Sequence, residues 1–134
     1  MSQANVETVL RTTAALARGD RDAVLAGFHP DAEWRDLHHP PDTPESVRGE
    51  GALQGLWDEW ERAFPGFSVD TDECLDAGDR VVTLTHWWVQ GRSSGLTLDL
   101  RTWDVFEFAD GKIARVTTGY ADRSAALKAV GVEE

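Results

Sequence analysis

Residues 101–120 read RTWDVFEFADGKIARVTTGY, two apolar-rich stretches separated by the dipeptide Asp110-Gly111. Both central positions of a two-residue hairpin turn favour a positive φ, which this dipeptide adopts readily. The stretch therefore predicts two antiparallel strands, over 96–108 and 112–120, joined by a tight turn. It also places the carboxyl group of Asp104 in the middle of a strand that otherwise suits the inside of a sheet.

Further strands precede this hairpin. FSVDTDECLDA over 67–77 leads into the turn signal Gly78-Asp79, and RVVTLTHWWVQ over 80–90 leads into GRSSG over 91–95. An earlier segment, AEWRDL over 32–37, also alternates as a strand does. The second half of the chain is therefore predicted to be an antiparallel meander.

Helical spacing of apolar residues dominates the first half. Helices are predicted over 6–17, 21–28 and 50–64, with a short tail helix over 124–130. Asp20 and Asp122 are the expected N-caps of the second and the last of them. Helices followed by a meander indicate one α+β domain over 1–134, with the helices packed on one face of a curved sheet.

The charge balance excludes several classes of partner. The chain carries 24 Asp and Glu against 13 Lys and Arg, a formal net charge of −11. This field repels nucleic acid and anionic membranes. No apolar run has the length of a membrane span and the N-terminus lacks the apolar core of a signal peptide, so we expect a cytoplasmic protein.

No motif indicates a cofactor. The sequence has no Gly-x-Gly-x-x-Gly and no phosphate-binding loop, and its histidines lack the paired helical spacing of a zinc site. The single cysteine, Cys74, excludes an internal disulfide and lies in an acidic run that disfavours a thiolate. We expect neither a cofactor nor a metal ion.

The direction in which Asp104 points depends on the strand register. We expect Gln90 to lie opposite Leu96 across the turn. One concave surface then carries four side chains of interest: Thr102, Asp104, His86 and Trp88. A slip of one residue would undo this arrangement. Two interpretations stay open: Asp104 faces the interior and has a task there, or it points outward to water or to an arginine.

Five segments carry a family resemblance: NVETVLRTTAALARGDRDAVLAGFHPDAEWRD (5–36), RGEGALQGLWDEW (48–60), DAGDRVV (76–82), DVFEFADGKIARV (104–116) and YADRSAALKAVGV (120–132). In sequence and in order they resemble the SnoaL-like family of the nuclear transport factor 2-like superfamily. The resemblance implies a single SnoaL-like domain over 1–134, a cone-shaped curved antiparallel sheet with N-terminal helices closing a pocket. It also implies a homodimer formed through the other sheet face.

The resemblance suggests roles by position. Asp36 matches the general base of ketosteroid isomerase, and Asp104 matches its second pocket acid, which stays protonated and donates a hydrogen bond. Thr118 and Tyr120 match pocket-facing positions. Thr12 stands where that enzyme has its oxyanion tyrosine, and a threonine cannot replace the acidity of a phenol. The resemblance therefore does not carry over the isomerase mechanism as a whole.

The candidate catalytic residues are Asp36 as base, Asp104 as acid or hydrogen-bond donor, and His86 as proton shuttle, because the ordinary pKa of histidine lies near neutrality. Burial should raise the pKa of Asp104 and leave it neutral or sharing a proton near pH 7. The predicted ligand-binding residues are Trp34, His38, Trp57, Trp60, Trp88, Thr102, Thr118 and Tyr120.

Each candidate also has a purely structural interpretation. His86 fits a core histidine, Trp57 and Trp60 fit a core helix stripe, and His38 fits a solvated loop. Two functions therefore stay open. One is a cofactor-free acid–base enzyme of the isomerase, cyclase, dehydratase or epoxide-hydrolase type, acting on a small hydrophobic carbonyl-bearing or polycyclic molecule. The other is a non-catalytic domain that binds a small aromatic ligand.

Overall fold

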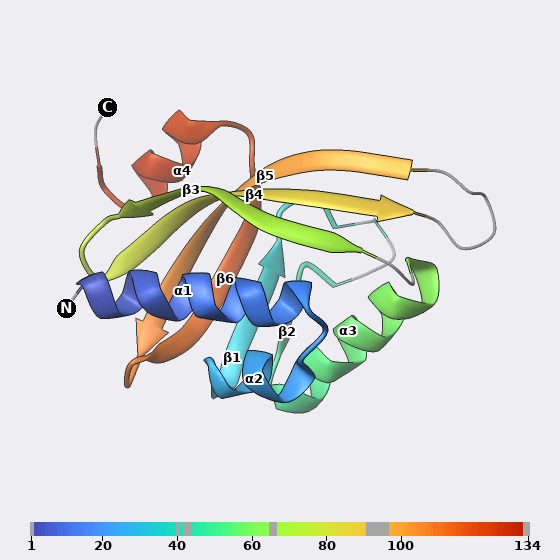
Figure 1. Ribbon diagram of the computed structural model, residues 1–134. Coiled ribbons are helices and arrows are strands. Elements are labelled where there is room, and N and C mark those ends of the chain that lie inside the picture. Colours follow the sequence, from blue (N-terminus) through green and yellow to red (C-terminus); the bar gives the residue numbers. More distant parts are fainter. Residues whose placement is uncertain (1, 40, 42–43, 65–66, 91–96, 133–134) are drawn as a thin grey trace.

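The computed structural model describes residues 2–39, 41, 44–64, 67–90 and 97–132. Its helices are α1 (Ser2–Ala17), α2 (Arg21–Ala26), α3 (Glu50–Ala63) and α4 (Arg123–Ala129). Its strands are β1 (Phe28–Asp36), β2 (Ser46–Arg48), β3 (Ser68–Asp76), β4 (Arg80–Gln90), β5 (Thr97–Ala109) and β6 (Lys112–Tyr120). The strands form one curved sheet in the order β2-β1-β6-β5-β4-β3 (Figure 1).

The predicted α+β cone fold is confirmed. α1 runs along one face of the sheet, which we call the inner face, and α4 lies on the other, which we call the outer face (Figure 1). The inner core cluster joins α1 to three strands through Val9, Val81, Phe106, Ile113 and Val116. The outer core cluster joins α4 to β4 and β5 through Val82, Val105, Ala126, Leu127 and Val130. Helices therefore cover both faces, not one.

Turns and helix caps were predicted correctly from local signals. Asp110 and Gly111 have φ of 54° and 74°, as the two-residue hairpin turn requires. The carboxylates of Asp20 and Asp122 accept hydrogen bonds from backbone N–H groups three residues ahead, at 3.2 and 2.8 Å. β3 to β6 form the predicted antiparallel meander. The predicted GRSSG turn, 91–95, lies outside the described residues.

The region around Pro30 differs from the prediction. The second helix ends at Ala26 rather than Phe28, and His29 and Pro30 belong to β1. Proline lacks the N–H that a ladder needs. It is accommodated because the β1–β6 register is irregular between Phe28 and Glu33. The sequence also did not predict β2, which is only three residues long.

β1 pairs parallel to β6, so the sheet is not a meander throughout. This pairing joins the first half of the chain to the last strand. In this register Asp36 lies directly opposite Thr118. The parallel pair therefore brings the two halves of the candidate site together.

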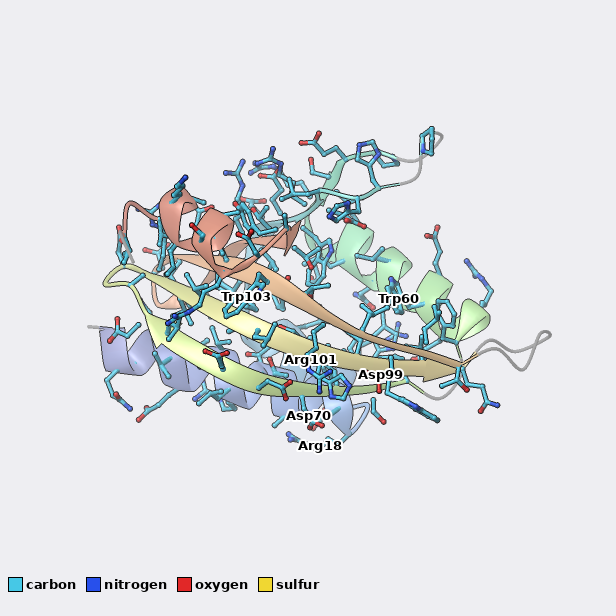
Figure 2. All side chains as sticks on the ribbon, turned by 90° about the horizontal axis from the view of Figure 1, so that it is seen from above. Arg18, Trp60, Asp70, Asp99, Arg101 and Trp103 are labelled. Carbon is cyan, nitrogen blue, oxygen red and sulfur yellow. The ribbon has the colours of Figure 1, made fainter. Side chains whose placement is uncertain are left out.

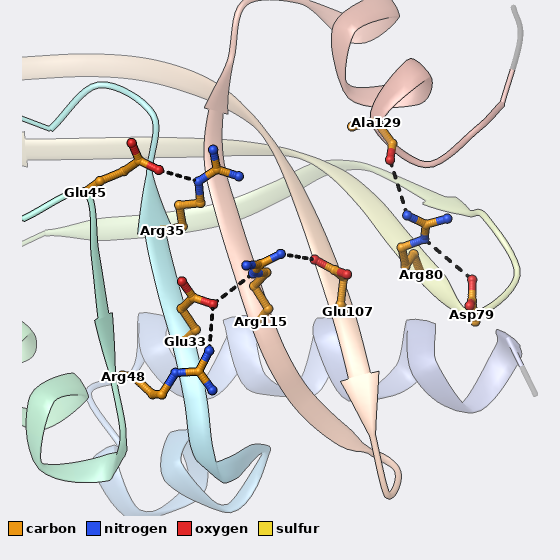
Figure 3. A network of polar contacts seen from close by, with 9 residues as sticks. All are labelled: Glu33, Arg35, Glu45, Arg48, Asp79, Arg80, Glu107, Arg115 and Ala129. Atoms are coloured by element: carbon orange, nitrogen blue, oxygen red, sulfur yellow. Dashed lines mark hydrogen bonds and ion pairs between the residues drawn. The ribbon is translucent and has the colours of Figure 1, made fainter.

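A ladder of ion pairs crosses the outer face of β2, β1, β6 and β5 (Figure 3). The Glu33 carboxylate lies 3.2 Å from the Arg48 guanidinium and 3.0 Å from that of Arg115, which also lies 3.6 Å from Glu107. Burial raises the pKa of Glu33, but hydrogen bonds from Ser46 and Arg115 and the two positive charges outweigh it and lower the pKa below its ordinary value. The ladder ties the edge strand β2 to the rest of the sheet.

Among the described residues, no helix combines the length and the apolar character needed to cross a membrane.

Candidate functional site

A row of paired residues crosses the inner face on four adjacent strands. Asp36 of β1 pairs with Thr118 of β6, Thr118 pairs with Asp104 of β5, and Asp104 pairs with Thr83 of β4. Paired residues point to the same side of a sheet. Trp34, two residues before Asp36, packs against the inner core cluster. Asp36 and Asp104 therefore lie on the same face of the sheet, and that they share one cavity stays a prediction.

Asp104 is buried, at 4% exposure, within a set of hydrogen-bond donors. The hydroxyl of Thr118 donates to Oδ1 at 2.6 Å, and the hydroxyls of Thr85 and Thr102 donate to Oδ2 at 2.7 and 3.2 Å. The backbone N–H of Gly119 also donates to this carboxylate. We call Thr85, Thr102 and Thr118 the threonine cage. Among the interactions of the described residues no arginine contacts Asp104. Hydrogen bonds from the threonine cage, rather than a positive charge, stabilise its ionised form.

Burial raises the pKa of Asp104 to about 6, against the lowering effect of the hydrogen bonds from the threonine cage and Gly119. The predicted direction of the change is confirmed. The predicted neutral or proton-sharing form near pH 7 stays a prediction. The hydrogen bonds from the threonine cage and Gly119 all favour the ionised carboxylate, which limits the rise of the pKa.

Gly119 produces a β-bulge that decides which way Tyr120 points. Asp104 pairs with Thr118 but Trp103 pairs with Tyr120, so Gly119, with φ of 97°, is the extra residue. The bulge reverses the alternation, and Tyr120 packs on the outer core cluster. The prediction that Tyr120 lines the inner pocket is wrong for this reason.

His38 lies against the same bulge. A Cβ atom at Gly119 would come within 2.7 Å of His38 Cδ2, so only glycine lets the ring and the strand lie this close. The backbone N–H of His38 donates to Asp36 Oδ1 at 2.8 Å. His38 therefore lies at the end of the row beside Asp36, although its side chain is exposed. This position keeps it among the candidate ligand-binding residues.

The predicted register of β4 and β5 is wrong by one residue. Gln90 pairs with Thr97 rather than Leu96, and Thr83 rather than Val82 lies opposite Asp104. Because side chains alternate with period two, the shift moves His86 and Trp88 to the outer face. They are not part of the inner-face site, and the predicted partnership of His86 with Asp104 is wrong.

His86 has other partners on the outer face. Its Nε2 lies 2.6 Å from Asp99 Oδ1, and it pairs across the sheet with Arg101. Arg101 in turn donates to Asp72 at 2.7 Å. Figure 2 looks onto these strands and labels Asp70, Asp99 and Arg101. This group is polar and lies on the side of the sheet opposite Asp104.

An aromatic cluster joins α3 to the inner face further along β4. Its members are Trp57, Trp60, Phe64, Phe67 and Trp87, with the Trp60 and Trp87 ring centres 5.6 Å apart. Trp87 was missed by the sequence analysis because the register error assigned it to the other face. Period-two alternation alone does not decide the face, because Val81 and Val82 are both fully buried on opposite sides of the sheet.

The side chains around this cluster are only partly covered. The apolar stripe of α3, Leu53, Leu56, Trp57 and Trp60, is half-buried, whereas α1 buries Val9 and Ala15 completely. Leu98 and Leu100, which pair with Val89 and Trp87, are 38% and 37% exposed. Arg21 of α2 holds α3 in place through an ion pair with Asp58 at 2.9 Å and a contact 5.0 Å above the Trp57 ring.

The predicted residues thus divide by face. Those that the structure places on the inner side are Asp36, Asp104, Trp34, Trp57, Trp60, Thr102 and Thr118. The described residues contain no group of three or more His, Cys, Asp or Glu side chains arranged to hold a metal ion. The inner face carries two carboxyl groups, several hydroxyl groups, the thiol of Cys74 and an apolar wall.

Comparison with known proteins identifies the domain. The SnoaL-like domain family model matches residues 9–116. No curated protein sequence shows significant similarity to this chain.

Solved structures share the fold at low sequence identity. An NTF2-like protein of unknown function from Burkholderia pseudomallei has a TM-score of 0.78 and 21% identity, covering 96% of this chain and 98% of its own. TerC co-crystallised with polyporic acid has a TM-score of 0.76 and 23% identity, covering 95% of this chain and 98% of its own. A Mycobacterium tuberculosis protein in complex with estradiol-17beta-hemisuccinate has a TM-score of 0.76 and 15% identity, covering 91% of this chain and 96% of its own.

Proposed function

Because the chain belongs to the SnoaL-like family, we propose that it is a cofactor-free acid–base enzyme acting on a small hydrophobic carbonyl-bearing or polycyclic molecule. The reaction type is isomerisation, cyclisation, dehydration or epoxide opening, each of which moves a proton at an activated carbon or oxygen. The observation that carries the proposal is the shared inner-face row of Asp36 and Asp104. Two carboxyl groups in unlike surroundings can divide the roles of base and acid.

Asp36 is the better placed base. It is only half-buried, at the end of β1, while Asp104 is enclosed by the threonine cage. A general base must reach the proton that it removes, to within about 3 Å. We therefore assign proton removal to Asp36. We assign to Asp104, on the opposite side of Thr118, the tuning of the hydrogen bonds made by the threonine cage.

The aromatic cluster supports an apolar substrate. Trp60, Trp87 and the exposed Leu98 and Leu100 form a wall suited to a flat ring system. Proteins of the same fold are recorded with polyporic acid and with estradiol-17beta-hemisuccinate. These molecules are cyclic and carry oxygen groups, which is the combination the inner face would accommodate.

The test is exchange of the α-protons of a bicyclic ketone, 2-tetralone, in heavy water, followed by proton NMR. Wild type should accelerate exchange, and Asp36→Asn should reduce the acceleration by about 100-fold, because an amide cannot accept the proton. Asp104→Asn should retain a good part of the activity, since it keeps the shape and a hydrogen-bonding group. Asp31→Asn, at an exposed position in β1, is the matched control.

Two results would contradict this assignment. An active Asp36→Asn together with an inactive Asp104→Asn would show that Asp104 is the base. Failure of the wild type to accelerate exchange in 2-tetralone and in a panel of larger ketones would remove isomerisation and cyclisation, the two reactions that begin with loss of a proton next to a carbonyl group.

The second candidate is a non-catalytic domain that binds a small aromatic ligand. The specific observation in its favour is the enclosure of Asp104, whose carboxylate oxygens are already occupied by the threonine cage and Gly119. Binding of a flat apolar probe, followed by quenching of tryptophan fluorescence, would be unaffected by Asp36→Asn in that case. Exchange of ketone protons would be absent.

We also propose that two copies associate through the outer face. α4 covers the end of that face around Val82 and Val105 (Figure 1). Beyond it, Trp88 is 41% exposed, and acidic and basic side chains lie together at Asp70, Asp99 and Arg101 (Figure 2). A large aromatic bordered by both charge signs suits a self-complementary interface.

A further inference from the structure

The hydroxyl protons of the threonine cage are already committed. A threonine hydroxyl has one proton to donate and two lone pairs that accept. An ionised carboxylate can only accept, so Thr118 at 2.6 Å and Thr102 at 3.2 Å must each direct that proton to Asp104. Toward any other molecule these two hydroxyls offer lone pairs alone.

Exposure decides which of these groups a ligand meets. Asp104, Thr83 and Thr85 are buried, whereas Thr102 and Thr118 are half-buried. Thr118 also pairs with Asp36 on its other side, so it lies between the two carboxyl-bearing strands. A molecule over this row therefore meets the oxygens of Thr118 and Thr102 and the carboxylate of Asp36, all of which accept hydrogen bonds.

We infer that the inner-face site selects ligands that carry a hydroxyl group, and that this hydroxyl donates its hydrogen bond to Thr118 or Thr102. The inference rests on the proposed function, because it concerns the same site and names the chemical class of its ligand. A substrate that also has a carbonyl group would place that carbonyl away from the threonine cage. The selection is made by threonine oxygens whose orientation Asp104 fixes.

Protonation of Asp104 would reverse this preference. A neutral Asp104 gives its own proton to one threonine oxygen, which frees that hydroxyl to donate to a carbonyl. The other titratable groups near the row are Asp36, in the same row, His38, whose ring lies against Gly119, and the thiol of Cys74, which pairs with Thr83. The buried residues of α1 are all uncharged: Thr8, Val9, Thr12 and Ala15. Since the pKa of Asp104 is about 6, we expect the preference to change from hydroxyl groups toward carbonyl groups as the pH falls from 7.5 to 5.

The test compares three naphthalene probes that differ in one group: 2-naphthalenemethanol, its methyl ether and 2-acetonaphthone. Binding is measured by quenching of tryptophan fluorescence near pH 7.5 and near pH 5. Near pH 7.5 the alcohol should bind on the order of ten-fold more tightly than the ether, the effect of one hydrogen bond. Near pH 5 this ratio should shrink and the ketone should gain affinity.

Variants at one position locate the effect. Thr118→Val keeps the branched shape but lacks the hydroxyl, and should bind alcohol and ether more equally. Thr118→Ser restores a hydroxyl and should restore the preference. Thr117→Val, buried on the opposite face, is the matched control and should leave the ratio unchanged. If Thr118→Val does not fold, Thr102→Val and the wild-type pH series give the same comparison.

Equal affinity of wild type for the alcohol and the ether near pH 7.5 would overturn the inference. If 2-tetralone exchange still depended on Asp36, the proposed function would stand without it. A clear alcohol preference without any ketone exchange would leave the inference standing and remove the isomerase and cyclase forms of the enzymatic proposal. Failure of all three probes to bind would overturn the inner-face ligand site, and both proposals with it.

Discussion

At the scale of single residues, Asp104 is the feature with the largest energetic consequence. Its pKa rises from the ordinary 3.8 to about 6 because the carboxyl group is buried. Below pH 3.8 both the folded and the unfolded chain hold the proton, and burial of the neutral acid costs least. As the pH rises to about 6 the unfolded chain loses its proton first, so the free energy of unfolding falls, by about 3 kcal/mol in all.

An Asp104→Asn variant should remove this loss. Its amide can accept from Thr118 and donate to Thr85 or Thr102, so the hydrogen bonds are kept without the charge. Relative to wild type, the variant should gain about 2 kcal/mol in unfolding free energy between pH 4 and pH 7.5. Urea denaturation at the two pH values measures the gain. Asp79→Asn, whose side chain is 89% exposed, is the control. A difference between Asp104→Asn and wild type that does not change with pH would contradict this account.

At the scale of elements, the β-bulge in β6 determines the composition of the site. It directs Thr118 to the inner face and Tyr120 to the outer face. Gly119→Ala combines an unfavourable φ of 97° with a contact of 2.7 Å to the His38 ring. We expect a loss of about 1–3 kcal/mol in unfolding free energy, measured by thermal or urea denaturation.

Two further variants separate these causes. Adding His38→Ala to Gly119→Ala removes the steric contact but not the backbone strain, so it should recover only part of the loss. Gly55→Ala, in α3 with open space around its Cα, should be neutral or slightly stabilising. A Gly119→Ala variant as stable as wild type would mean that the bulge is absent and that Tyr120 faces inward.

The same elements explain how far the sequence could be interpreted. The hairpin at Asp110-Gly111, the N-caps and the meander were predictable because each depends on local chemistry that the sequence states directly. The β4–β5 register was not, because no local signal distinguishes Leu96 from Thr97 as the partner of Gln90. The resemblance placed Asp36 and Asp104 together although the register argument for His86 was wrong. The bulge at Gly119 needed contacts between distant segments to be recognised.

At the scale of the whole molecule, we propose different tasks for the two faces of the sheet. The inner face carries the carboxyl row and the aromatic cluster. The outer face carries α4, the ladder around Glu33 and the exposed Trp88. A site on one face and an association surface on the other can change independently, so variants of one should not alter the other.

The association surface has its own test. Wild type should sediment at twice the mass of the chain, and Trp88→Lys should shift the equilibrium toward the single chain, because it adds a charge where we place the interface. Asp31→Lys, exposed in β1, adds the same charge elsewhere and should leave the mass unchanged. A wild type that sediments as a single chain at micromolar concentration would exclude the outer-face dimer.

The central feature of the site is the buried carboxyl group of Asp104 held by threonine hydroxyls, and carbon-13 NMR of aspartate carboxyl groups tests it without any ligand. One carboxyl signal should titrate with a midpoint near 6 and disappear in Asp104→Asn. In Thr85→Val the midpoint should rise, because a donor that favours the ionised form is lost. If every aspartate titrated below pH 5, or if the midpoint fell in Thr85→Val, the threonine cage around Asp104 would be contradicted.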